Sequence, residues 1–98
     1  MNEKNEDIVN ALTELRSTSE ILVVALKGND IDKAHEAVSI LLMQGIGFFG
    51  PKSVVMQQFF PVFDTIKTRI DTNNLAGALG QTELFQVQLK AILAMIPK

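Results

Sequence analysis

Apolar residues recur along this chain at spacings of three and four, the period of a helix that buries one face. The clearest case runs through Leu12, Leu15 and Leu22. Similar patterns predict helices over about residues 5–27, 30–44, 52–71 and 74–96. The fold class that follows is all-α.

Short polar links separate the first helix from the second and the third from the fourth. Asn5 is a suitable cap for the first helix, and Gly28 a suitable stop. Asn29 or Asp30 suits the start of the second helix, and Asn73 or Asn74 the start of the fourth. Links this short join antiparallel neighbours, so residues 1–98 are predicted to form one domain: an antiparallel up-down four-helix bundle made of two helix hairpins.

The middle of the chain interrupts the helical pattern. Three glycines and a proline within residues 45–51 predict a loop after Gln44. This loop would carry Ile46, Phe48 and Phe49, although loops usually carry polar residues. Two interpretations stay open: the rings fold back and close the end of the bundle, or they contact a partner or a membrane surface.

The third helix holds a proline in its interior. Its start is predicted at Pro51, with Ser53 as the alternative cap. Pro61 removes one backbone hydrogen bond, so the helix should kink there or divide into two pieces.

The two predicted hairpins resemble each other. The segment Asn29–Ala34 is similar to Asn73–Ala78, at an offset of 44 residues. The same offset places Leu15 and Leu22 on Phe59 and Ile66. Either a hairpin is duplicated, or two amphipathic hairpins match by chance.

The chain carries more apolar residues than four helices of this length can hide among themselves. Hydrophobic residues make up 47% of the sequence, and the mean hydropathy is +0.21. Residues 21–26 are apolar on every side, and only Glu83 and Lys90 are charged in the last helix. The residues predicted to bind a partner are Val23, Val24, Ile46, Phe48, Phe49, Leu84 and Val87.

Motifs for chemistry are missing from the sequence. The net charge is −2 without a basic stripe, which argues against nucleic-acid binding. There is no cysteine, and His35 is the single histidine, so we expect no metal site. Gly45, Gly47 and Gly50 have the spacing of a dinucleotide fingerprint, but a helix precedes them where that motif needs a strand. We therefore expect no enzyme and no catalytic residue.

The layout is similar to that of haem-carrying four-helix cytochromes, whose axial ligands are a Met in the first helix and a His in the last. Residues 5–27 contain no Met and residues 74–96 no His, so no cofactor is expected.

Polar residues border the apolar stripes and suggest a buried polar layer. They are Ser19, Gln57, Gln58, Gln81, Thr82, Gln86 and Gln88. Such a layer would fix the register of the helices or bind a small ligand.

These observations favour a non-enzymatic protein–protein interaction module of the adaptor, chaperone or immunity type, with a homodimer as the favoured state. The alternative is a bundle that holds a small apolar ligand between its helices, where Ala76, Gly77, Ala78 and Gly80 would leave space and the Pro61 kink an entrance. No apolar run reaches the length of a membrane span, and a cytoplasmic location is expected. Peripheral membrane contact through Phe48 and Phe49 is a secondary possibility.

Overall fold

Each of the four helices turns one apolar face toward a common core. The computed structural model describes residues 3–96, and the side chains of residues 6–96. The helices are α1 (Glu3–Lys27), α2 (Ile31–Phe49), α3 (Val54–Asp71) and α4 (Leu75–Met95). Because α1 already begins at Glu3, the cap predicted at Asn5 is wrong. Pro97, the predicted stop of the last helix, lies outside the described residues.

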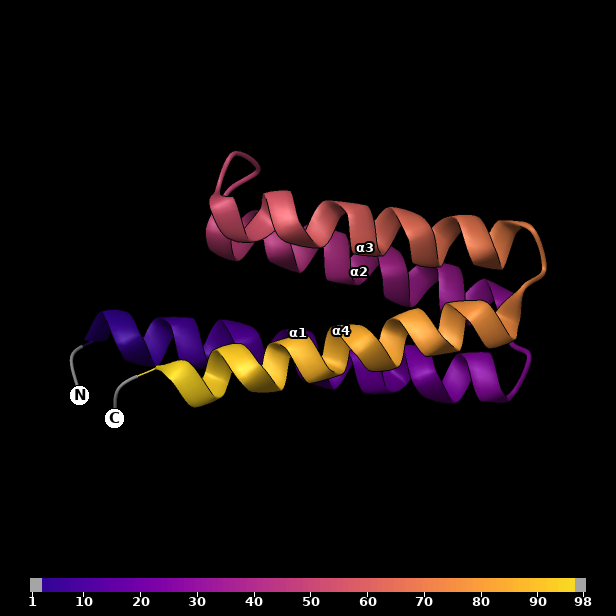
Figure 1. Cartoon of the computed structure of the whole chain (residues 1–98), viewed down its shortest axis with the longest axis horizontal. Coiled ribbons are helices and arrows are strands. Elements are labelled where there is room, and N and C mark those ends of the chain that lie inside the picture. Colours follow the sequence, from indigo (N-terminus) through magenta and orange to yellow (C-terminus); the bar gives the residue numbers. More distant parts are fainter. Residues whose placement is uncertain (1–2, 97–98) are drawn as a thin grey trace.

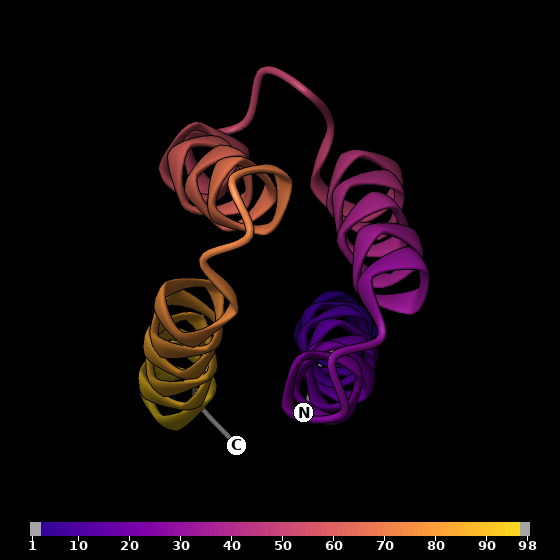
Figure 2. The same ribbon diagram turned by 90° about the vertical axis from the view of Figure 1, so that its right-hand side faces the viewer.

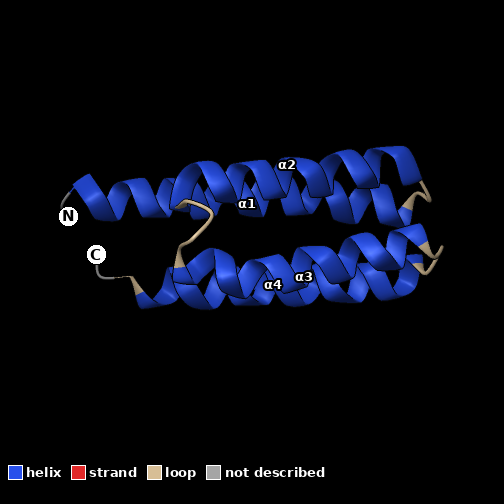
Figure 3. Ribbon diagram, turned by 90° about the horizontal axis from the view of Figure 1, so that it is seen from above, coloured by secondary structure: helices blue, strands red, loops and turns tan. Residues whose placement is uncertain are grey.

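The helices run alternately up and down and occupy the corners of a square (Figures 1 and 2). α1 packs against α2 and α4, and α3 packs against the same two helices. The α1–α2 and α3–α4 turns lie at one end of the bundle, and the α2–α3 connection lies toward the other (Figure 3). This confirms the predicted up-down four-helix bundle, which measures 43 × 23 × 17 Å.

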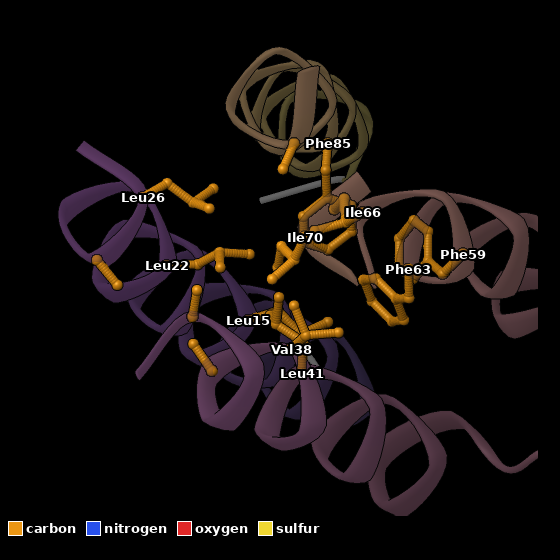
Figure 4. Close-up of a cluster of buried hydrophobic side chains, with 14 of the residues drawn as sticks. Leu15, Leu22, Leu26, Val38, Leu41, Phe59, Phe63, Ile66, Ile70 and Phe85 are labelled. Carbon is orange, nitrogen blue, oxygen red and sulfur yellow. The ribbon is translucent and has the colours of Figure 1, made fainter. Parts of the chain in front are cut away.

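Three phenylalanines pack together in the core (Figure 4). The ring centroid of Phe85 lies 5.1 Å from those of both Phe59 and Phe63, with interplanar angles of 85° and 73°. Edge-to-face pairs of this kind add about 0.5–1.5 kcal/mol beyond their buried area. Leu15 from α1 and Leu41 from α2 reach the same core, so all four helices contribute to it.

The second helix is longer than predicted. α2 does not end at Gln44 but continues to Phe49, and the N–H of Gly50 donates to the carbonyl of Ile46 at 2.9 Å. Gly50 has a φ of +84°, which glycine adopts without strain. The predicted loop over residues 45–51 is therefore wrong, and the connection shortens to residues 50–53.

α2 continues past Gln44 because Gly45 faces the core rather than a turn. A Cβ atom there would come within 2.6 Å of the sulfur of Met56, a fully buried side chain on α3. The missing side chain thus lets Met56 pack directly against α2. A glycine in a helix costs up to about 1 kcal/mol, and packing of this kind offsets that cost.

The third helix begins after the alternative cap. The hydroxyl of Ser53 accepts a hydrogen bond from the N–H of Met56 at 3.1 Å, and Pro51 lies outside the helix. α3 continues through Pro61 without a break, so its division into two pieces is wrong. Both Pro61 and Gln57 are exposed, and water can replace the hydrogen bond that proline removes.

The two hairpin turns have the same geometry. Asn29 and Asn73 both adopt left-handed backbone angles, with φ of 57° and 60°. The next N–H in each turn reaches back five residues, from Asp30 to the carbonyl of Ala25 at 2.9 Å and from Asn74 to that of Arg69 at 2.7 Å. This is the Schellman arrangement, which satisfies the last carbonyls of a helix.

The same two turn residues also start the following helices. The side chain of Asp30 accepts a hydrogen bond from the N–H of Lys33, and that of Asn74 accepts one from Gly77. The pattern of buried residues also repeats at the 44-residue offset, since every buried residue of α3 and α4 has a buried counterpart 44 positions earlier. The similarity of the two hairpins is therefore structural.

Candidate interaction surfaces

The residues predicted to bind a partner lie on separate parts of the surface. Their exposed fractions are 70% for Val24, 63% for Val87, 49% for Leu84, 43% for Phe48 and 36% for Ile46, while Val23 and Phe49 are half-buried. Val24 on α1, Ile46 on α2 and Val87 on α4 line three different grooves.

Phe48 and Phe49 have different surroundings. Both lie in the last turn of α2 and meet edge to face, with centroids 6.4 Å apart. Phe49 packs against the core, whereas Phe48 points into solvent over 43% of its surface. The two interpretations of this pair therefore divide between the residues, and only Phe48 is available for contact.

A groove with an apolar lining runs between α2 and α3. Its volume is about 640 Å³, and it is open to solvent. The residues that line it are Val38, Leu42, Ile46, Phe60, Pro61, Phe63, Asp64 and Lys67. We call this the α2–α3 groove. Asp64 and Lys67 are its only charged lining residues, and both are exposed.

The opposite pair of neighbours, α1 and α4, forms a second groove with a different lining. It is smaller, about 310 Å³, and its lining is mostly charged or amide-bearing. The residues that line it are Arg16, Glu20, Glu83, Gln86, Val87 and Lys90.

The structural repeat relates these two grooves position by position. At the 44-residue offset, Leu42 corresponds to Gln86 and Ile46 to Lys90. Likewise, Phe60 corresponds to Arg16. The bundle therefore accommodates polar side chains at these positions on one side and apolar ones on the other. Helix packing alone therefore does not require Leu42, Ile46 and Phe60 to be apolar, although Leu42 and Phe60 also pack against the core.

Charge is sparse around the α2–α3 groove. Between Glu36 and Asp64 the only charged residue is Lys52. This stretch covers most of α2, the connection and the first half of α3, where Met43 and Val54 are 72% and 70% exposed. A surface with so few charges is easily dehydrated when another surface covers it.

Part of the predicted polar layer exists inside the bundle. Ser19 and Thr82 are fully buried, and the amide of Gln86 donates to the hydroxyl of Ser19 at 3.1 Å. On the α1–α2 side, the hydroxyl of Thr18 donates to Gln44 at 2.8 Å. These bonds link helices and fix their register. Of the other predicted members, Gln57, Gln58 and Gln88 are exposed and Gln81 is half-buried.

His35 links two helices. Its Nε2 atom lies 3.1 Å from Oδ1 of Asp71, which joins α2 to α3 near the hairpin turns. Within the part of the chain that the structure describes, no three His, Asp, Glu or Cys side chains gather as metal ligands.

The small residues of α4 do not leave the space expected between the helices. Ala76 and Gly80 are exposed, and Ala78 is fully buried in the core. At Gly77, a Cβ atom would come within 2.6 Å of the Asn74 side chain and 2.9 Å of Arg69. Their side chains therefore occupy that space. Over the described helices, none is long and apolar enough to cross a membrane.

The chain matches no protein-family model, no curated protein and no solved structure. The residues of this chain therefore carry the argument for its function. The sequence prediction included Ile46 and named Pro61 only as a kink at an entrance. It missed Leu42 and Phe60 as surface residues, because each fits equally well on a buried stripe. Comparison of the two repeats is the signal that reveals them.

Proposed function

We propose that this chain is a non-enzymatic protein–protein interaction module that self-associates, with the α2–α3 groove as its binding surface. One observation carries the proposal: apolar residues occupy this groove where the equivalent α1–α4 groove holds Arg16, Gln86 and Lys90. Apolar surface that the fold itself does not need is typical of a surface that binds another protein.

The repeat suggests how to test this surface without damaging the fold. In Ile46→Lys, a lysine occupies the position whose counterpart, Lys90, is already a lysine. The bundle should tolerate it, since Ile46 is 36% exposed. Val24→Lys is the matched control, because Val24 is 70% exposed on α1 and lies outside the groove.

Sedimentation equilibrium of the unchanged chain, Ile46→Lys and Val24→Lys measures the dissociation constant of the dimer. We expect the unchanged chain to form a dimer as its concentration rises. Ile46→Lys should raise the dissociation constant at least about tenfold, a loss of about 1.4 kcal/mol, whereas Val24→Lys should leave it unchanged. A chain that stays monomeric up to about 1 mM, where even a weak dimer would form, would contradict self-association. A dimer sensitive only to Val24→Lys would place the contact elsewhere.

A second candidate function uses the same groove. A volume of about 640 Å³ beside Pro61 suits a small apolar molecule held by Leu42 and Phe60. Native mass spectrometry of the purified chain tests this. A retained molecule that is lost in Phe60→Arg would support it, and bare protein after exposure to cell lipids would argue against it.

A further inference from the structure

We propose that a second surface, formed by α1 and α2, binds a basic amphipathic helix of another protein. This surface is separate from the α2–α3 groove, so the proposal goes beyond the proposed function and does not depend on it. Together, the two surfaces would let one chain join two different partners.

Two adjoining hollows lie between α1 and α2. Their volumes are about 580 and 200 Å³, and Ile21 and Lys33 line both of them. They therefore form one continuous groove along residues 17–28 and 30–40, which we call the α1–α2 groove. Ile21, Val24 and Ile40 are apolar residues of its lining, and all three are exposed. α1 and α2 lie together on one side of the bundle, with α3 and α4 on the other (Figure 3).

The fold does not need the apolar residues that α1 contributes to this groove. At the 44-residue offset, Ile21 corresponds to Thr65 and Val24 to Thr68. The second hairpin keeps the same turn and the same pattern of buried residues with threonine at both positions. Ile21 and Val24 are therefore available to contact a partner.

The charges of the α1–α2 groove indicate what kind of partner fits. Among its described lining residues, Glu20, Asp30 and Glu36 are acidic, and Lys33 is the one base. All four side chains are exposed and border the apolar lining. Such a surface is complementary to a helix that carries apolar residues on one face and Lys or Arg beside them.

The charge imbalance extends beyond the groove. Residues 1–49 contain eight acidic and four basic residues, whereas residues 50–98 contain three and five. Glu20 lies 3.8 Å from Arg16, but both side chains are more than half exposed, and such a pair is weak. The first hairpin therefore attracts a basic partner at low ionic strength, and salt should reduce this attraction.

The second hairpin shows that a cationic side chain fits in the equivalent place. Arg69 stands at the position of Ala25, and Gly77 at that of Lys33. A Cβ atom on Gly77 would come within 2.9 Å of Nη1 of Arg69, so the guanidinium lies between these two positions. In the α1–α2 groove, Ala25 leaves this space open and Lys33 borders it. A cation from a partner can enter when the exposed side chain of Lys33 turns aside.

The length of the α1–α2 groove sets the length of the partner segment. Residues 17–28 extend over about 16 Å, which is about three turns of a helix. On α2, Ile40 lines this groove and Leu42 lines the α2–α3 groove. Two positions apart in a helix, their side chains point about 160° away from each other. Both grooves can therefore be occupied at the same time.

A designed peptide tests the groove directly. The peptide is an amphipathic helix of about 18 residues, with leucines on one face and lysines elsewhere, and its twin carries glutamate in place of every lysine. Fluorescence anisotropy of the labelled peptides with the full chain measures both affinities. We expect the lysine peptide to bind at least about tenfold more tightly than the glutamate peptide, and salt to reduce the difference.

Three variants locate the bound peptide. Val24→Lys should weaken binding of the lysine peptide at least about tenfold. Thr68→Lys is the matched control, because it adds the same charge at the equivalent exposed position of the other hairpin and should leave binding unchanged. Lys33→Ala should strengthen binding, since it removes the base that borders the groove.

The possible results separate this inference from the proposed function. Equal binding of the two peptides, or binding that is the same in Val24→Lys and Thr68→Lys, would overturn the inference. Neither result bears on self-association, which is measured without peptide and tested with Ile46→Lys. Conversely, a chain that stays monomeric but binds the lysine peptide in the α1–α2 groove would contradict the proposed function alone.

Discussion

At the scale of single residues, the glycines of α2 have opposite effects. Gly45 faces Met56 across the core, while Gly47 is exposed with open space around the position of a Cβ atom. Gly47→Ala should therefore stabilise the chain by about 0.5–1 kcal/mol, the usual gain in helix propensity. Gly45→Ala should lose that gain and destabilise, because overpacking a core costs about 1–3 kcal/mol.

Urea unfolding followed by circular dichroism measures both variants. The two substitutions are chemically identical and lie two residues apart in the same helix, so each is the control for the other. Equal stabilisation by both would mean that Met56 moves aside freely and that Gly45 is not a packing position.

At the scale of elements, the two hairpin turns should respond alike to the same substitution. Asn29 and Asn73 hold left-handed conformations that cost an ordinary L-residue about 1–2 kcal/mol. We expect Asn29→Ala and Asn73→Ala each to lower the free energy of unfolding by about 1 kcal/mol. Glycine at either position should be neutral or stabilising.

Asn10→Ala provides the control for these turn variants. Asn10 is exposed within α1, where alanine has the better helix propensity. Thermal unfolding of the five variants completes the comparison. A large loss at Asn29 with none at Asn73 would mean that the turns share a shape but not an energetic role.

The elements also show what a sequence can predict. Short polar turns at Asn29 and Asn73 identify the hairpins correctly, because capping is local chemistry. The end of α2 was wrongly predicted, because the fate of Gly45 depends on Met56, a residue on another helix. The same applies to Phe60 in the candidate site. Its helical position alone does not distinguish a buried stripe from a groove wall.

At the scale of the whole molecule, the stability of the bundle depends less on the order of the helices along the chain than on the apolar faces that the helices turn toward the core. The start of α1 and the end of α4 lie at the same end of the bundle (Figure 1). The connection over residues 50–53 is short and lies between two hairpins with equivalent cores. Most of the stabilising contacts therefore do not depend on which hairpin comes first.

A circular permutant follows from this arrangement. If a flexible linker joins the present ends and the backbone is opened at Lys52, the chain reads α3, α4, α1, α2. We expect it to keep the helical content of the natural order and a cooperative unfolding transition, because termini placed in exposed connections are well tolerated. Circular dichroism with urea titration would decide. A molten, non-cooperative permutant would mean that the connection between the hairpins directs their assembly.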